Sequence, residues 1–250
     1  MIDGVPGPES DRLLSRKPIP PRERLIVALD VDGYAEALDL VDQLGDSVSF
    51  YKLGLQLFMS RRYFELSDLL LARRKRVFLD LKFFDVPETV ASAVRMLAGT
   101  GAHFATVHGN DAMLEAAVRE KKDTKILAVT VLTSLDRADL EDLGFDVSVE
   151  ELVLSRARRA LALGCDGVVS SGLEARALRD ELGDRLLIVS PGIRPVENRP
   201  QDDQKRVVGV EQAFRNGADY IVVGRPIRAA KDPRAAAEAI QTTIASLFSE

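Results

Sequence analysis

The chain has 250 residues, of which 46% are hydrophobic, so its length suits one large α/β barrel or two smaller domains. Its formal net charge of -5 and the lack of any long run of Lys and Arg argue against nucleic acid as a partner. A lone cysteine, Cys165, excludes an intramolecular disulfide and a multi-cysteine metal site, and two histidines, His103 and His108, are too few for the usual three-ligand zinc site.

Neither membrane insertion nor export is expected. No stretch approaches the roughly 18 consecutive apolar residues of a membrane span, and the N-terminus lacks the apolar core of a signal peptide. Residues 1 to about 21 combine proline, glycine and charge without apolar periodicity, which is typical of a flexible leader. We therefore expect a cytoplasmic protein with no membrane partner, whose folded domain spans residues 22–250.

From Arg24 onward, short β-branched or aliphatic runs alternate with longer segments of helical patterning. The runs that we predict to be strands are residues 25–30, 48–53, 76–81, 103–107, 126–131, 167–170, 186–190 and 220–223. The intervening segments include predicted helices at residues 34–43, 87–99, 112–121 and 149–163. Eight such units predict an α/β fold, a single-domain (βα)8 TIM barrel. Cys165 directly precedes the sixth strand and is expected to pack in the core.

The alternative architecture is an open doubly wound sheet. A dinucleotide site in that fold needs a Gly-x-Gly-x-x-Gly turn after the first strand. The first predicted strand runs instead into Val31-Asp32-Gly33. The barrel is therefore the favoured architecture.

Charged residues recur where the predicted strands end. Asp30 ends the first run, Lys52 the second, and Asp80 with Lys82 the third. Active sites of such barrels lie at the C-terminal ends of the strands, so these four side chains are expected to converge on one mouth. Asp85 follows in the next loop and adds a third charge around this strand end.

Residues two apart on a strand face the same way, so Asp80 and Lys82 are expected to point together while Leu79 and Leu81 face the packed side. One such pair by itself is usually a solvated ion pair. The convergence with Asp30 and Lys52 favours a functional cluster. A lysine flanked by carboxylates keeps its ammonium form, which indicates a proton donor at Lys82 and argues against imine chemistry there.

The loops after the seventh and eighth predicted strands suggest a phosphate site. Residues 191–195 read Pro-Gly-Ile-Arg-Pro, and residues 224–227 read Gly-Arg-Pro-Ile. Small residues expose backbone N–H groups in these loops, and arginine adds a forked donor. Thr133-Ser134 offers hydroxyls at the same face, whereas His108 is expected to be a structural residue. A phosphorylated small molecule is the expected ligand.

The run from Phe78 to Val90, FLDLKFFDVPETV, resembles the signature of orotidine 5′-phosphate decarboxylases. Further segments that match this family, in order, are Ala28–Asp30, Tyr51–Gly54, Val131–Ser134, Pro191–Pro195, Asp203–Arg206 and Val223–Ile227. The resemblance spans nearly the whole chain. It implies conversion of orotidine 5′-phosphate to uridine 5′-phosphate, the last step of pyrimidine nucleotide synthesis, without a metal or an organic cofactor and in a homodimer.

The resemblance also implies a role for each matching residue. Lys82 would protonate the pyrimidine C6, and Lys52, Asp80 and Asp85 would complete an alternating charged network, with Asp85 reaching into the partner subunit's site. The implied substrate contacts are Asp30, Lys52 and Thr89 at the ribose, Thr133 near the base, and Gln204, Gly224, Arg225 and Arg194 on the phosphate side.

Two other functions remain open. A metal-assisted keto-sugar-phosphate decarboxylase or aldol-type synthase can use the same barrel, and magnesium dependence would distinguish it. A catalytically silent barrel would bind a nucleotide without turnover, although the full set of charged residues argues against it.

Overall fold

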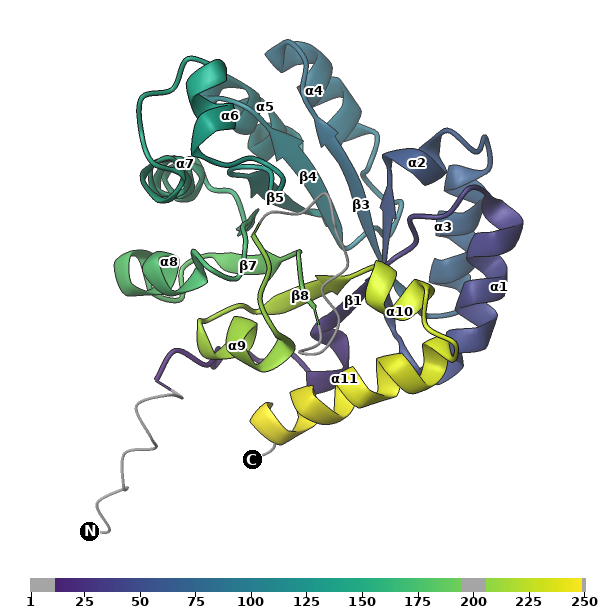
Figure 1. The fold of residues 1–250 in the computed structure, drawn as a ribbon. Coiled ribbons are helices and arrows are strands. Elements are labelled where there is room, and N and C mark those ends of the chain that lie inside the picture. The colour runs from purple at the N-terminus through teal and green to yellow at the C-terminus, as the bar shows by residue number, and fades with distance from the viewer. Residues whose placement is uncertain (1–11, 195–205, 249–250) are drawn as a thin grey trace, which may run out of the picture.

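The computed structural model describes residues 12–194 and 206–248, and at its centre is a closed barrel of parallel strands in chain order (Figure 1). The strands are β1 (Leu25–Ala28), β2 (Phe50–Gly54), β3 (Arg76–Phe83), β4 (Phe104–His108), β5 (Lys125–Val129), β6 (Gly167–Val169), β7 (Leu187–Ser190) and β8 (Tyr220–Val223). Every predicted strand is present, with its ends within about two residues of the predicted bounds. The (βα)8 barrel is confirmed.

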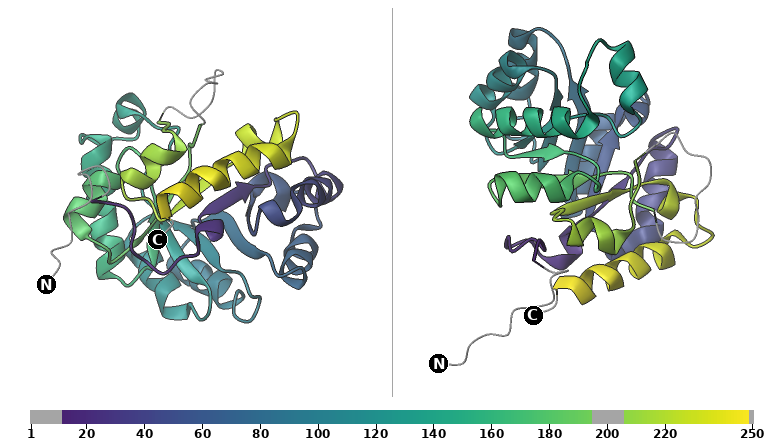
Figure 2. Two further views of the ribbon diagram at one scale, coloured as in Figure 1. Left: turned by 90° about the horizontal axis from the view of Figure 1, so that it is seen from below. Right: turned by 60° about the vertical axis from the view of Figure 1, so that its left-hand side comes forward.

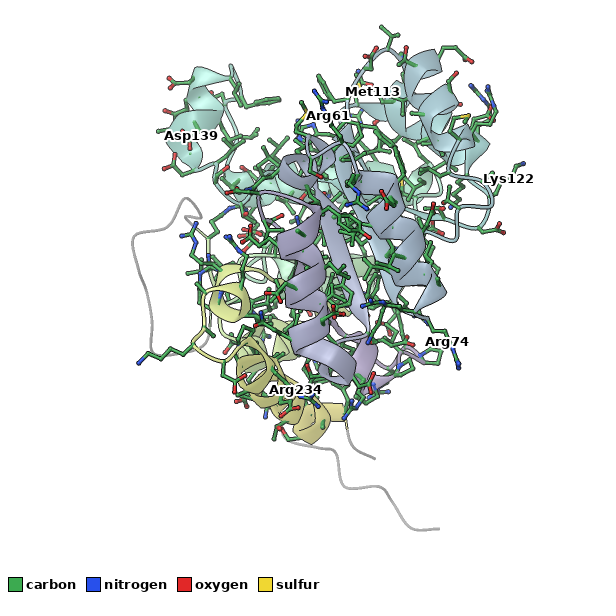
Figure 3. All side chains as sticks on the ribbon, turned by 90° about the vertical axis from the view of Figure 1, so that its right-hand side faces the viewer. Arg61, Arg74, Met113, Lys122, Asp139 and Arg234 are labelled. Carbon is green, nitrogen blue, oxygen red and sulfur yellow. The ribbon has the colours of Figure 1, made fainter. Side chains whose placement is uncertain are left out.

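Helices surround the barrel (Figures 1 and 2). They are α1 (Tyr34–Leu44), α2 (Leu55–Phe58), α3 (Tyr63–Ala72), α4 (Pro87–Arg95), α5 (Asp111–Glu120), α6 (Arg137–Asp142), α7 (Val149–Ala162), α8 (Ala175–Leu182), α9 (Val210–Arg215), α10 (Arg225–Arg228) and α11 (Pro233–Phe248). Charged side chains such as Arg74, Lys122 and Arg234 lie at the periphery (Figure 3). No described helix combines the length and the apolar content that a membrane span requires.

Local sequence accounts for several helix ends. The Asn110 side chain accepts a hydrogen bond from the backbone N–H of Met113 at the start of α5, and Ser148 and Glu151 form a capping box at the start of α7. α4 ends at Arg95, short of the predicted end at Gly99, because the chain turns there and Gly99 adopts a φ of +76°.

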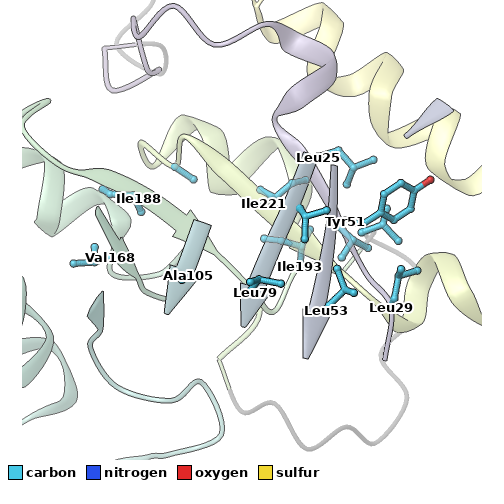
Figure 4. Close-up of a cluster of buried hydrophobic side chains, with 14 of the residues drawn as sticks. Leu25, Leu29, Tyr51, Leu53, Leu79, Ala105, Val168, Ile188, Ile193 and Ile221 are labelled. Atoms are coloured by element: carbon cyan, nitrogen blue, oxygen red, sulfur yellow. The ribbon is translucent and has the colours of Figure 1, made fainter. Parts of the chain in front are cut away.

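The strands bury both faces, and successive residues alternate between two apolar layers. Leu25 and Val27 of β1 pack outward against the helices, in the cluster shown in Figure 4. Ile26 and Ala28 point into the barrel. This continuous burial is typical of parallel strands covered by helices, and it explains why the strands read as unbroken apolar runs.

Aromatic rings fill the N-terminal half of the barrel interior. Phe104 packs against Phe50 with ring centroids 5.4 Å apart, against Phe78 at 5.7 Å and against Tyr220 at 5.2 Å. These rings belong to the inner layer and are almost completely buried. They close one end of the barrel, so the inward-facing positions nearer the C-terminal strand ends are left for polar residues.

Residues 12–21 pack against the N-terminal end of the barrel instead of lying outside the folded domain. Figure 2 (left) shows this purple segment passing across that end. Ser15 is 5% exposed and donates a hydrogen bond to Asp219, while Lys17 Nζ lies 3.2 Å from the same carboxylate. The folded domain therefore begins earlier than expected, because long-range ion pairing, invisible in local composition, holds this segment. Residues 1–11 of the expected leader lie outside the described residues.

Asp219 anchors this end of the barrel. Its side chain is fully buried and also accepts hydrogen bonds from Arg179 and from the backbone N–H of Ile188 at 2.8 Å. Arg179 in turn donates to the backbone carbonyls of Gly183 and Leu186. A buried carboxylate such as Asp219 is stable only while these charged and hydrogen-bonding partners are present.

We expect Asp219→Ala to lower the free energy of unfolding by about 3–5 kcal/mol, because the substitution leaves the buried Arg179 charge uncompensated. Chemical denaturation followed by circular dichroism would measure the change. The control is Asp184→Ala. The Asp184 side chain is 63% exposed, and its ion pairs with Lys17 and Arg179 are long, at 3.7 Å each, so its loss should cost little. Equal stability of the two variants would contradict the anchoring role.

Candidate active site

A cavity of about 460 Å³ opens at the C-terminal ends of the strands. Its apolar floor includes Ala28, Phe78 and Val222 from the inner layer. The structure brings most of the predicted site residues to its walls, namely Asp30, Lys52, Asp80, Lys82, Thr133, Arg194, Gly224 and Arg225. Gln204 lies outside the described residues.

Four charged side chains form an alternating chain across one wall of this cavity. Lys52 Nζ lies 3.0 Å from Asp30 Oδ1 and 3.3 Å from Asp80 Oδ2. Lys82 Nζ lies 2.9 Å from the same Asp80 oxygen. The expected convergence of these residues is therefore confirmed, and Asp80 is the carboxylate that links the two lysines.

Burial and charge act in opposite directions on this network. Burial by itself lowers the pKa of Lys52, but the charges of Asp80 and Asp30 and their hydrogen bonds outweigh it and raise that pKa. Burial likewise favours the neutral form of Asp80, yet the charges of Lys52 and Lys82, with hydrogen bonds from Lys82 and Thr106, hold its pKa below the usual value. Both groups therefore remain charged, with Asp80 only 7% exposed.

The alternation of β3 is interrupted where Lys82 enters the site. Leu79 pairs with Ala105 of β4 but Phe83 pairs with Val107, so an irregularity separates the two registers. Lys82 lies within it and has a φ of +48°, in the left-handed region that non-glycine residues rarely adopt. Lys82 thus reaches Asp80 through a bulge and not through the regular strand alternation that was expected. Leu79 and Leu81 do pack on the outer face, as predicted.

The loops after β7 and β8 line the same cavity. Gly192 and Arg194 follow β7, and Gly224 and Arg225 follow β8. Arginines next to glycine-containing loops suit a phosphate group, because the guanidinium fork and exposed backbone N–H groups both donate to its oxygens. The predicted phosphate side is thus adjacent to the charged chain within one cavity.

Two predicted residues lie elsewhere in the single chain. Asp85 and Thr89 are exposed and line a separate surface groove of about 370 Å³ together with Phe84. Asp85 Oδ1 accepts a hydrogen bond from the backbone N–H of Val86 at 2.7 Å. Lys82 lines both the groove and the cavity, so the two are adjacent.

Three residues that the sequence analysis did not single out also belong to this region. Thr106, on the inward face of β4, hydrogen-bonds both Asp80 and the backbone of Lys82. Gln56 lines the cavity and donates to Asp32 Oδ1 at 2.7 Å, and Arg228 lines it from α10. Strand periodicity could have identified Thr106, since it lies two residues beyond the inward-facing Phe104.

Cys165 and His108 are both packed against other parts of the protein. Cys165 is buried as predicted, and burial raises the pKa of its thiol to about 12. Burial, followed by the charges of Arg156 and Lys82, lowers the pKa of His108, whose ring packs edge-on against Phe84 at 5.5 Å. Within the described ranges, no group of three His, Cys, Asp or Glu side chains is arranged to bind a metal ion.

Comparison with known proteins identifies related chains. The model of the "Orotidine 5'-phosphate decarboxylase / HUMPS family" matches residues 23–240. An orotidine 5′-phosphate decarboxylase of Methylococcus capsulatus is 67% identical over 235 residues, covering 94% of this chain and 97% of the relative. One of Stenotrophomonas maltophilia is 54% identical over 237 residues, covering 93% and 98%.

Solved structures agree with these sequence matches. The crystal structure of the orotidine 5′-phosphate decarboxylase from Lactobacillus acidophilus has a TM-score of 0.78 and 35% identity, covering 89% of this chain and 99% of that one. The enzyme from Pyrococcus horikoshii has a TM-score of 0.70 and 26% identity, covering 88% and 98%.

Gly54 allows the close approach of Asp30 and Lys52. A Cβ at this position would lie 3.1 Å from Asp30 Oδ1 and 3.1 Å from Lys52 Nζ. We expect Gly54→Ala to displace the pair and to lower kcat/KM for orotidine 5′-phosphate, the substrate that the resemblance implies, roughly tenfold. Steady-state kinetics would measure this. Gly33→Ala is the control, because a Cβ there meets nothing within 4 Å; equal kinetics for both variants would contradict the packing argument.

Proposed function

The chain belongs to the orotidine 5′-phosphate decarboxylase / HUMPS family, and we propose that it converts orotidine 5′-phosphate to uridine 5′-phosphate with Lys82 as the proton donor. The observation that carries this proposal is the charged chain Asp30–Lys52–Asp80–Lys82 at the mouth of the barrel. It places an ammonium group in a cavity that also contains arginines suited to a phosphate.

The reaction needs stabilisation of negative charge on carbon. When the bond between C6 and the carboxylate breaks, carbon dioxide leaves and the electron pair remains on C6. The Lys82 ammonium stabilises this developing charge, then transfers a proton to C6 and later regains one from solvent. A donor already held in place by Asp80 at 2.9 Å needs little reorganisation during the reaction.

Asp80 and Lys52 hold the proton donor in position. The Asp80 carboxylate is buried and has a lowered pKa, so it stays ionised beside Lys82. Lys52 neutralises part of that charge and is itself fixed by Asp30 at 3.0 Å. In this arrangement Asp30 and Lys52 also contact the ribose of the substrate.

The rest of the cavity positions the substrate. Arg194, Gly224 and Arg225 bind the phosphate together with Gln204, and Thr133 lies near the base. Binding energy from the phosphate, which does not react, orients C6 against Lys82 and so contributes to the rate of the chemical step.

A homodimer completes the site. Asp85 and Thr89 lie on the exposed rim beside Lys82, where they can reach the cavity of a partner subunit. The apolar side chains next to Asp85 support an interface here, since Phe84 is 65% and Val86 63% exposed. Asp85 thus extends the alternating charges across the two subunits.

The two other functions are less well supported. The family description also names HUMPS proteins, but the relatives at 67% and 54% identity are named orotidine 5′-phosphate decarboxylases. A silent nucleotide-binding barrel would have no use for the buried Asp80 carboxylate between two lysines, which costs desolvation energy.

Purified protein incubated with orotidine 5′-phosphate and a chelator is expected to show the full change in ultraviolet absorbance.

Lys82→Ala should lower kcat by at least about 10³-fold with the fold intact, because both charge stabilisation and the proton are lost. Lys122→Ala, an exposed lysine remote from the cavity, serves as the control. Magnesium dependence would favour the sugar-phosphate alternative, and substantial turnover by Lys82→Ala would remove Lys82 as the donor.

Mixed dimers test whether Asp85 acts in the partner's site. Lys82→Ala and Asp85→Ala are each expected to be nearly inactive, yet their equimolar mixture after subunit exchange should recover roughly a quarter of wild-type activity, since half of the dimers carry one complete site. Lys82→Ala mixed with Asp80→Asn should recover none, because both residues belong to the same chain's site. Recovery in neither mixture would overturn the contribution across the interface.

A further inference from the structure

Thr106 lies at the junction between Asp80 and Lys82. It is fully buried on the inward face of β4. Its hydroxyl lies 2.9 Å from Asp80 Oδ1 and 2.9 Å from the backbone nitrogen of Lys82. One hydroxyl therefore contacts the side chain of one catalytic residue and the main chain of the other.

The direction of both hydrogen bonds follows from the chemistry of the groups. An ionised carboxylate only accepts, so the Thr106 hydroxyl donates its one proton to Asp80 Oδ1. A backbone N–H only donates, so the same oxygen accepts from Lys82. Asp80 Oδ1 is thereby occupied by Thr106, while Oδ2 receives both Lys52 and Lys82. Thr106 fixes the rotation of the carboxylate that orients the lysines.

The strand register shows why a side chain is needed at this point. Between the pairs Leu79–Ala105 and Phe83–Val107, three residues of β3 lie opposite Thr106 alone. Regular ladder pairing cannot continue across this mismatch, and the N–H of Lys82 is bonded by the Thr106 side chain in place of a backbone carbonyl. The same residue, Lys82, has the left-handed φ of +48° that turns its side chain into the cavity.

We propose that Thr106 is a positioning residue for the decarboxylation, which holds the Lys82 bulge and the Asp80 carboxylate in register; this inference rests on the proposed function. Thr106 reaches the reacting atoms only through these two residues. Its loss leaves the N–H of Lys82 and one oxygen of Asp80 without their partner inside the protein, so both relax away from the geometry needed for proton transfer.

The test compares Thr106→Val, which keeps the shape but lacks the hydroxyl, with Thr106→Ser, which keeps the hydroxyl. We expect Thr106→Val to lower kcat roughly 10- to 100-fold with KM changed less than about threefold, and Thr106→Ser to retain most of the wild-type kcat. Thr130→Val is the matched control, since Thr130 is also fully buried and donates to the carbonyl of Val169, away from the charged chain.

The pH dependence separates positioning from a merely structural role. The hydrogen bond from Thr106 is one of the contacts that lower the pKa of Asp80, after the charges of Lys52 and Lys82. Without it the carboxylate protonates at higher pH, so the acid limb of the kcat profile of Thr106→Val should move upward. Thr130→Val should leave the profile unchanged.

Each outcome bears on the proposal. Wild-type kcat and an unshifted acid limb in folded Thr106→Val would overturn it, even if that variant were less stable. If valine prevents folding, Thr106→Cys supplies a weaker donor and acceptor, and its kcat should then fall below that of Thr106→Ser. A wild-type kcat in Thr106→Cys would again overturn the role. A wild-type enzyme inactive on orotidine 5′-phosphate would overturn the proposed function and, with it, this role.

Discussion

The buried charge of Asp80 is the constraint on which the site depends. A carboxylate that is 7% exposed is stable only when both of its oxygens have hydrogen-bond donors and its charge is balanced. Lys52 from β2, Lys82 from β3 and Thr106 from β4 supply those partners, and Lys52 in turn needs Asp30 beyond β1. Four consecutive βα units therefore have to be assembled before the network exists, so the site is a product of the tertiary structure.

The barrel separates stability from chemistry along its axis. At the N-terminal end, aromatic rings around Phe104 fill the interior, and the Asp219 cluster ties residues 12–21 and Arg179 to the strands. Near the C-terminal end, the inward positions carry Lys52 and Asp80. The packed end provides a rigid support for charges whose positions have to be accurate, which is the general division of labour in this fold.

The rim beside the cavity indicates how one chain can depend on another. The segment after β3 exposes Phe84 and Val86 on either side of Asp85, directly after the strand that delivers Asp80 and Lys82. The same short stretch thus supplies two residues to its own cavity and presents a third outward. In the proposed dimer, this arrangement couples subunit association to completion of the charged network.

The eight strands could be predicted from the amino-acid sequence, because buried parallel strands leave unbroken apolar runs. The cavity residues Asp30, Lys52 and Asp80 could be predicted too, because they lie at the ends of those runs. The bulge at Lys82 and the contacts of Thr106 could not be predicted, since both depend on the register between β3 and β4. The same holds for the packing of residues 12–21, whose partner Asp219 is about 200 residues away in sequence. Local patterns encode burial and periodicity, whereas strand register and long-range ion pairs arise only when distant segments pack together in the folded barrel.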